Sequence, residues 1–175
     1  MINRHVFVLA LVLAGCGGIG PQPTPTPVPV PPAPAAVVQE LLSAHNKLRS
    51  ARGLPDFILD PKLSSAANGH AAFMDQHGVM AHEGIGDGTP WRRITAAGYS
   101  YSSAAENIAM DPQGVQGVMV LWERSPLHLI NIMGPYRDVG FGASGSYYCV
   151  DFGTPMGTTT TPEGPAASST SHSRQ

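Results

Sequence analysis

The fold class is decided by one stretch near the C-terminus, Tyr136-Arg137-Asp138-Val139-Gly140-Phe141-Gly142-Ala143-Ser144-Gly145-Ser146-Tyr147-Tyr148-Cys149-Val150-Asp151-Phe152. Two apolar and aromatic runs flank the small residues at 144–146, which predicts a hairpin with strands at 136–143 and 147–152. The chain before this hairpin is dominated by helical patterns. Helices beside one hairpin indicate an α+β sandwich, in which a small antiparallel sheet is covered by helices.

Five helices are expected upstream of the hairpin or just before it. Apolar residues recur at three- and four-residue spacing over 37–48 and 63–74, and these runs stop at Gly53 and Gly78. Four pairs place a capping residue before a proline and predict helix starts: Asp60-Pro61, Thr89-Pro90, Asp111-Pro112 and Ser125-Pro126. Shorter strand-like runs lie at 57–59, 99–101 and 107–109.

The first 15 residues have the pattern of an export signal. Arg4 precedes eight consecutive apolar residues, a run too short to span a bilayer. The ending Leu13-Ala14-Gly15-Cys16 resembles a bacterial lipobox, which implies cleavage before Cys16 and lipidation of its thiol. The alternative is a plain secretory signal with an incidental cysteine. Lipidation predicts an extracytoplasmic protein anchored to a membrane by its acyl chains, and Gly17 points to the outer membrane in a Gram-negative host.

The chain divides into four parts. After the signal (1–15), residues 16–36 form an uncharged tether in which eight of the 14 residues from Pro21 to Pro34 are proline, favouring extended polyproline II. Residues 37–153 form the folded domain. Residues 154–175 are rich in Thr, Ser, Pro and Gly without apolar periodicity, so we expect a disordered tail.

Composition excludes one class of partner. The domain carries 8 Lys and Arg against 11 Asp and Glu, and its basic residues are not clustered. Nucleic acid is therefore not expected as a partner, because binding to phosphates requires a basic surface.

Three residues suit one chemical site. Glu106 lies in an apolar segment and needs a partner there, because an unpaired buried charge is costly. His82 follows a helix end in a glycine-rich loop, and His128 lies on the first turn of the expected helix 126–133. Two imidazoles and a carboxylate suit a divalent metal, Zn²⁺ above all, or a hydrogen-bond network without metal. Their spacing matches no compact ligand motif, so both alternatives stay open.

Ser125 has two possible roles beside His128. It is placed to cap the following helix, and it also lies one helical turn from an imidazole that could act as its base. We favour the cap, because no Gly-x-Ser-x-Gly turn accompanies a nucleophile.

Taken in order, the motifs of residues 44–153 resemble the CAP superfamily (cysteine-rich secretory proteins, antigen 5 and pathogenesis-related proteins), in its bacterial SCP-like branch. The matching pieces are Asn46-x-x-Arg49-x-x-x-Gly53-Leu54, Leu63-x-x-Ala66-Ala67-x-x-His70-Ala71, His82, Asp87-Gly88 with Arg93, Gly98-Tyr99, Glu106-Asn107-Ile108-Ala109, Trp122-x-x-Ser125-Pro126-x-His128, Asn131-Ile132, Val139-Gly140-Phe141-Gly142 and Asp151-Phe152-Gly153.

The resemblance implies an α-β-α sandwich with a central cleft that holds two histidines and two glutamates, with a divalent metal on the histidines in some members. His82, Glu106 and His128 match three of these four positions. Ser125 stands where eukaryotic members carry the second glutamate, and Leu129 stands where bacterial relatives usually carry arginine. The missing glutamate argues against hydrolysis by the full set of four.

We therefore expect an envelope-anchored binding module rather than an enzyme. Its cleft would take a small ligand, a lipid, a peptide or an envelope polymer, with or without a metal on His82 and His128. The alternatives are a metal-assisted hydrolase of peptides or glycans with Glu106 as general base, and a structural adhesin or scaffold. Cys149 is expected to be a buried, inert thiol in a monomer, with a Cys149-linked dimer as the alternative.

Overall fold

The computed structural model describes residues 30–157, so the expected signal, Cys16, most of the tether and most of the tail lie outside the described residues. The elements in chain order are α1 (Ala35–Ser50), β1 (Ile58–Leu59), α2 (Pro61–His77), α3 (Pro90–Ala96), β2 (Tyr101–Met110), α4 (Val115–Arg124), α5 (Pro126–Ile132), β3 (Asp138–Ser144) and β4 (Tyr147–Pro155). In the described part of the chain, no helix combines the length and hydropathy needed to cross a membrane.

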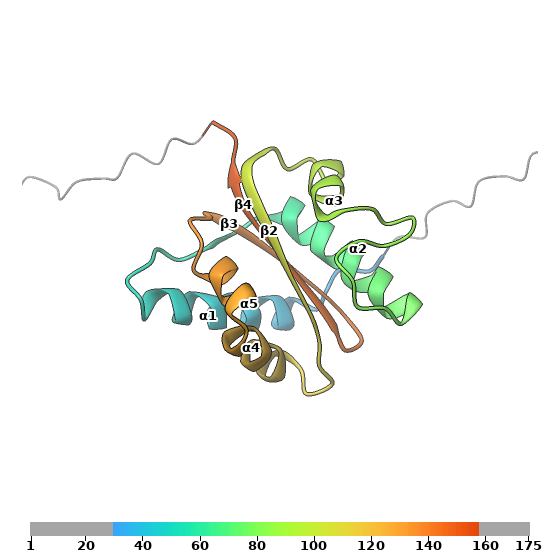
Figure 1. Ribbon diagram of the computed structural model, residues 1–175, viewed down its shortest axis with the longest axis horizontal. Coiled ribbons are helices and arrows are strands. Elements are labelled where there is room, and N and C mark those ends of the chain that lie inside the picture. Colours follow the sequence, from blue (N-terminus) through green and yellow to red (C-terminus); the bar gives the residue numbers. More distant parts are fainter. Residues whose placement is uncertain (1–29, 158–175) are drawn as a thin grey trace, which may run out of the picture.

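The four strands form one sheet in the order β1-β3-β4-β2. Figure 1 labels three of them, β2, β3 and β4. The expected hairpin is confirmed, because β3 and β4 pair antiparallel from Asp138↔Gly153 to Ser144↔Tyr147. Strand β2 pairs antiparallel with β4, whereas the two residues of β1 pair parallel with β3. The sheet is therefore mixed rather than wholly antiparallel.

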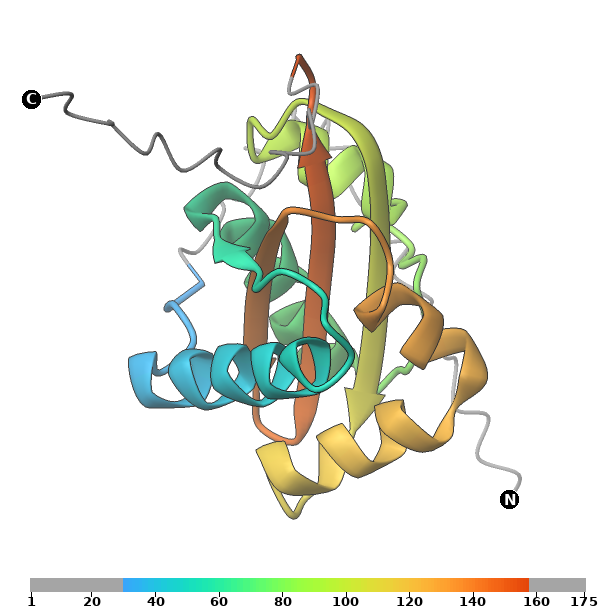
Figure 2. The same cartoon turned by 90° about the vertical axis from the view of Figure 1, so that its left-hand side faces the viewer.

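Helices cover both faces of this sheet, which confirms the α-β-α sandwich (Figure 2). On one face, α1, α4 and α5 enclose a core built around Leu41, Trp122, Phe141 and Phe152, all at most 1% exposed. On the other face, α2 and α3 pack on β2, β3 and β4 through smaller residues, among them Ala67 and Ala71. The two faces thus differ in how closely the helices approach the strands.

Helix α2 lies directly on the backbone of β3. A side chain at Gly140 would overlap the backbone of Leu63 and Ser64, and one at Gly142 would overlap the backbone of Ala67. The helix itself is well delimited: the Asp60 carboxylate accepts hydrogen bonds from the amides of Lys62 and Leu63, and Gly78 ends it in the left-handed conformation.

One helix start and one expected capping hydrogen bond differ from expectation. Helix α4 begins at Val115 after Gly114 rather than at Asp111-Pro112. The Asp111 side chain instead accepts a hydrogen bond from the Gln113 amide at 2.7 Å, so this pair forms a turn before the helix. Ser125 does occupy the N-cap position of α5, but its hydroxyl makes no capping hydrogen bond.

The strand run expected at 107–109 lies inside one long strand, β2, whereas of the run expected at 99–101 only Tyr101 belongs to it. It extends over Tyr101–Met110 because β4 supplies hydrogen-bond partners along that length. Strand β4 in turn continues to Pro155, two residues past the expected end of the domain.

Polar side chains of α1 hydrogen-bond to the loops around it. Asn46 exchanges two hydrogen bonds with the Phe57 backbone, at 3.3 and 2.8 Å. Arg49 donates to the carbonyls of Pro55, Ile132 and Gly134, and its guanidinium lies 3.9 Å from the centre of the Phe57 ring. These bonds hold the segment before β3 against α1.

His45 is an ionisable group inside the aromatic core. Its side chain is fully buried, with ring centres of Trp122 and Phe141 at 5.6 and 5.0 Å. Its Nδ1 donates to the Leu41 carbonyl at 2.7 Å, and its Nε2 has no partner among the described residues. Burial, more than any neighbouring charge, lowers the pKa of His45 to about 4.

Replacing Gly140 by alanine should destabilise the fold by roughly 3 kcal/mol, because the new methyl group meets helix backbone that cannot move without displacing α2. Urea denaturation followed by circular dichroism measures the change. Gly69→Ala is the matched control, since no described atom outside its own helix lies within 4 Å of the added methyl. The control should gain about 0.5–1 kcal/mol. Equal stabilities of Gly140→Ala and wild type would contradict the close packing.

His45 should make the protein less stable in acid. The unfolded chain protonates this histidine near pH 6.5, whereas the folded chain does so only near its pKa of about 4. The unfolded state therefore binds the proton first, and stability falls as pH falls from 6.5 to 4. The difference in unfolding free energy between wild type and His45→Gln should change by about 3 kcal/mol between pH 7 and pH 4. A difference independent of pH would contradict this account.

Candidate functional site

The Glu106 carboxylate is the centre of a buried hydrogen-bond network on the α2 face of the sheet. Its Oε1 accepts from His82 Nδ1 at 2.7 Å, and its Oε2 accepts from Arg93 Nη2 at 2.6 Å. The Cys149 thiol also donates to Oε2, at 3.3 Å. Only 1% of the Glu106 side chain is exposed. The buried carboxylate, which was expected to need a partner, therefore has two N–H donors, His82 and Arg93.

Burial by itself would raise the pKa of Glu106. The hydrogen bond from His82 and the positive charge of Arg93 outweigh burial and hold that pKa below its ordinary value. Glu106 is thus a carboxylate at neutral pH, and a carboxylate only accepts hydrogen bonds. His82 must then carry its proton on Nδ1, which leaves the lone pair of a neutral ring on Nε2.

Arg93 forms hydrogen bonds to the loop that carries His82. Besides Glu106, this α3 residue donates to the His82 carbonyl at 3.0 Å, the Gly88 carbonyl at 2.7 Å and the Asp87 carboxylate at 3.1 Å. Buried His70 of α2 adds contacts from Nδ1 to Asp87 at 2.5 Å and from Nε2 to the Ala81 carbonyl at 2.9 Å. His70 thus connects α2 to this loop through both of its ring nitrogens.

His82 itself reaches the surface. Its side chain is 50% exposed, although the carboxylate behind it is buried. A half-exposed imidazole with a fixed Nδ1 proton and a free Nε2 can bind a metal, accept a hydrogen bond or take up a proton.

His128 approaches from the opposite face of the sheet. It lies on the first turn of α5, and its backbone carbonyl accepts from the Asn107 side chain at 3.0 Å. Glu106 and Asn107 are consecutive in β2, so their side chains point to opposite faces. Because β2 is an edge strand, a residue from either face can lie beside this edge, and His128 is close enough to His82 to interact with it electrostatically. Burial first, and then the charge of His82, lowers the pKa of His128.

The structure therefore brings His82 and Glu106 into direct contact and places His128 within electrostatic range of His82. It shows no hydrogen bond between His128 and Glu106 in residues 30–157. The Nδ1 atom of His128 is buried and has no partner among these residues. Ser125 makes no hydrogen bond to His128 through its hydroxyl in the same part of the chain, so the expected alternative of a nucleophile and its base has no support in this geometry.

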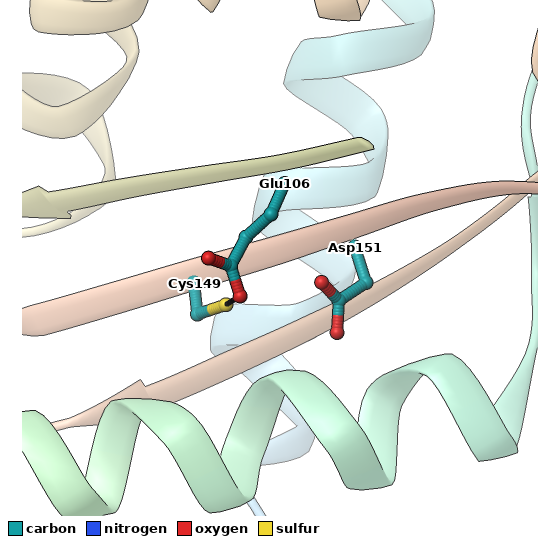
Figure 3. A group of neighbouring side chains, drawn as sticks. All are labelled: Glu106, Cys149 and Asp151. Atoms are coloured by element: carbon teal, nitrogen blue, oxygen red, sulfur yellow. Dashed lines mark hydrogen bonds between the residues drawn. The ribbon is translucent and has the colours of Figure 1, made fainter. Parts of the chain in front are cut away.

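Sequence reasoning missed a second cluster beneath His82. Figure 3 shows Glu106, Cys149 and Asp151 pointing toward one another, and ligand-type atoms of all three lie within 4.8 Å of one another. Glu106 pairs with Asp151 across β2 and β4, and Cys149 lies two residues from Asp151 on the same strand face. The alternation of Cys149 and Asp151 was visible in the sequence, but the register that sets them beside Glu106 was not.

The charged forms of Asp151 and Cys149 are disfavoured in this cluster. Both are fully buried, and neither carboxylate oxygen of Asp151 has a partner among residues 30–157. Burial, and then the charge of Glu106, raises the pKa of both groups well above their ordinary values. Glu106 is already paired with a cation, Arg93. Raised pKa values of Asp151 and Cys149 disfavour metal binding by this cluster, because both groups must lose their protons to act as ligands. The expected buried, unpaired thiol of Cys149 is confirmed.

Two cavities lie outside the group formed by His82, Glu106 and His128. One of about 400 Å³ is lined by Gly84, Asp87, Arg92 and Arg93 in the loop region before and within α3. The other, of about 660 Å³, lies at the opposite edge of the sheet. Neither is lined by His82, Glu106 or His128, so neither corresponds to the expected central cleft.

Comparison with known proteins places this architecture. The chain is 28% identical over 121 residues to the uncharacterized protein YkwD of Bacillus subtilis (strain 168). The match covers 67% of this chain but 47% of the relative, so the chain spans about half the length of that protein.

Two solved structures share the fold. One is an extracellular protein containing a SCP domain from Bacillus anthracis, with a TM-score of 0.66 and 23% identity over 68% of this chain and 40% of that one. The other is an outer surface protein from Borrelia burgdorferi, with a TM-score of 0.63 and 20% identity over 69% of this chain and 94% of that one. Identities this low support the fold alone.

Residues 42–153 match the family of cysteine-rich secretory proteins, described as CAP. This segment contains the whole sheet except the end of β4, together with His82, Glu106 and His128. Because the match covers well over half of the chain, the protein belongs to the CAP family.

Proposed function

We propose that this protein is an extracytoplasmic binding module that takes its ligand on the imidazoles of His82 and His128, with a divalent metal ion as the simplest ligand. The observation that carries the proposal is the 2.7 Å hydrogen bond from His82 Nδ1 to Glu106. It fixes the ring orientation and leaves Nε2 available on a side chain that is 50% exposed. In metal sites a histidine ligand usually donates its other ring N–H to a carboxylate or a similar acceptor, which fixes the orientation of the ring.

The residues present fit a metal such as Zn²⁺. His128 contributes a second imidazole whose Nδ1 has no partner among the described residues, and its lowered pKa keeps it neutral at pH 7. Neutral imidazole nitrogen is a preferred zinc ligand. Two protein ligands leave coordination positions for water or for a ligand carried by another molecule, which fits exchangeable rather than structural metal.

The geometry favours binding over hydrolysis with Glu106 as general base. Both oxygens of Glu106 are occupied, and only 1% of its side chain is exposed, so a water molecule does not reach them. In this arrangement Glu106 is a positioning residue that acts through His82. A hydrolase would have to use His82 itself as the base.

Location outside the cytoplasm is supported by two kinds of evidence. The solved relatives are named as an extracellular protein and an outer surface protein. In the sequence of this chain the apolar run at 6–13 is followed closely by Cys16 in a lipobox-like setting. We propose that lipidation at Cys16 anchors the domain to a membrane through the proline-rich tether. Mass spectrometry of the membrane fraction tests this, with Cys16→Ala as the control. A wild-type protein without acyl chains would contradict the proposed anchor.

Zinc titration by calorimetry should show one saturable site in the purified protein and none in the His82→Ala/His128→Ala double variant. Each single variant should lose at least tenfold in affinity, because one remaining imidazole binds zinc weakly. Affinity should also fall below about pH 6, where protons compete for imidazoles with a free pKa of ~6.5. Undiminished binding at pH 5 would contradict coordination by two histidines.

A Cys149→Ser variant is the matched control for this titration, because it alters the buried cluster and leaves both histidines in place. It should bind zinc as the wild type does. With Co²⁺ in place of Zn²⁺, the wild type should lack the strong near-ultraviolet absorption that a thiolate ligand produces. Loss of binding in Cys149→Ser would move the metal to the Glu106, Cys149 and Asp151 cluster and overturn the histidine site.

Replacing Glu106 by glutamine should weaken zinc binding about 10- to 100-fold without removing a metal ligand. The amide no longer supplies the negative charge that fixes the His82 Nδ1 proton. The same titration measures the loss, and circular dichroism checks that the fold persists, since Arg93 keeps its bond to Asp87. An unchanged affinity would mean that Glu106 does not position His82.

A further inference from the structure

A second cavity lies at the edge of the sheet farthest from the histidines. Strand β1 pairs only with Asp138 and Val139 of β3, so the remainder of that β3 edge has no strand beside it among residues 30–157. The segment of residues 30–34, here named the strap, passes this gap beside α2 before entering α1 (Figures 1 and 2). The cavity between the strap, α1, α2 and Phe141 has a volume of about 660 Å³.

The lining of this cavity is neutral. Hydrocarbon side chains from four elements line it, namely Val30 of the strap, Val38 of α1, Leu59 of β1 and Phe141 of β3. The polar lining groups are hydroxyls and amides, and none of the described lining residues carries a formal charge. A volume between about 300 and 1,000 Å³ with an apolar lining and few polar groups is typical of small-molecule sites.

Gly69 keeps this cavity open. It lies in the interior of α2, where glycine weakens a helix relative to alanine. Gly140 and Gly142 are required by the backbone that packs against them, but no described atom outside its own helix lies within 4 Å of a side chain placed at Gly69. Packing of the described chain therefore does not require glycine here. The missing side chain instead leaves space in the cavity wall.

Asn68 offers a polar anchor next to Gly69. This side chain is 7% exposed, and its Nδ2 donates to the Pro31 carbonyl of the strap at 2.8 Å. Its Oδ1 is buried and has no hydrogen-bond partner among the described residues. A buried acceptor without a donor is costly, so a ligand that brings an N–H or O–H group to this place gains affinity.

We propose that this cavity binds an uncharged molecule with a hydrocarbon body and one N–H or O–H donor, which the Asn68 side-chain oxygen accepts. The site is separate from the histidines in position and in chemistry: it lies at the β1/β3 edge of the sheet, whereas Glu106 lies on β2 at the other edge.

The probe N-phenyl-1-naphthylamine tests the proposal, because it is uncharged, largely hydrocarbon and carries a single N–H, and its fluorescence rises in apolar surroundings. The full chain should bind it saturably with one site. Gly69→Leu fills the cavity and should weaken binding at least tenfold. Because leucine favours helix more than glycine does, this variant should be at least as stable as the wild type. Wild-type affinity in a folded Gly69→Leu protein would overturn the proposal.

The N-methyl derivative of the probe lacks the donor and tests Asn68. The wild type should prefer the N–H probe by about tenfold, the size of one hydrogen bond. Asn68→Leu should bind both molecules alike. An equal affinity of the wild type for both probes would remove Asn68 from the site.

Two controls exclude other binding places. Leu127→Ser removes an apolar side chain that is 79% exposed on α5, and the His82→Ala/His128→Ala variant removes the histidine site. Both should bind the probe as the wild type does, so a failed zinc titration leaves this proposal unaffected. Loss of probe binding in Leu127→Ser would show adsorption to the surface. A tenfold gain on deleting residues 17–29 would show that the chain's own tether fills the cavity, and either result would overturn the proposal.

Discussion

Helix α2 rests on the bare backbone of β3, and the position of the histidine site depends on that contact. Gly140 and Gly142 leave no side chains between helix and strand, so the helix lies close to the sheet along their shared length. The loop that leaves α2 is thereby held near β2, where His82 meets Glu106. Buried His70, on the same helix, bonds this loop at both ring nitrogens. If a methyl group added at Gly140 or Gly142 moved α2 away from the sheet, the loop that carries His82 would move with it.

The buried carboxylates on the α2 face of the sheet share few partners of opposite charge. Arg93 compensates Glu106 and Asp87 and also bonds two loop carbonyls, so one guanidinium links α3, the loop and the sheet. Asp151 lies beside this network with no hydrogen-bond partner in the described chain, and burial and then the charge of Glu106 raise its pKa. Within this network the Glu106 carboxylate is the one that orients the half-exposed imidazole of His82.

The two edges of the sheet carry different chemistry. At the β2 edge, imidazole nitrogens project from a charged network, whereas at the β1/β3 edge a neutral cavity lies under the strap. Residues 30–34 belong to the expected tether, so the neutral cavity lies where that segment enters α1. Under the two proposals made above, the protein would hold one ligand by coordination at the histidines and a second, apolar molecule at a separate site.

Local patterns in the sequence were sufficient for the helices with clear ends and for the closing hairpin, because capping residues and strand alternation act over a few residues. Asp60-Pro61 predicted α2 correctly, whereas Asp111-Pro112 formed a turn, since the same side-chain chemistry serves both structures. Family motifs marked His82, Glu106 and His128, but only the tertiary structure showed that Glu106 is buried behind His82. The pairing of Asp151 with Glu106, the neutral cavity and the parallel strand β1 depend on register and on contacts between distant segments. Such contacts leave no periodicity in the sequence, and for this reason the three-dimensional structure alone decided them.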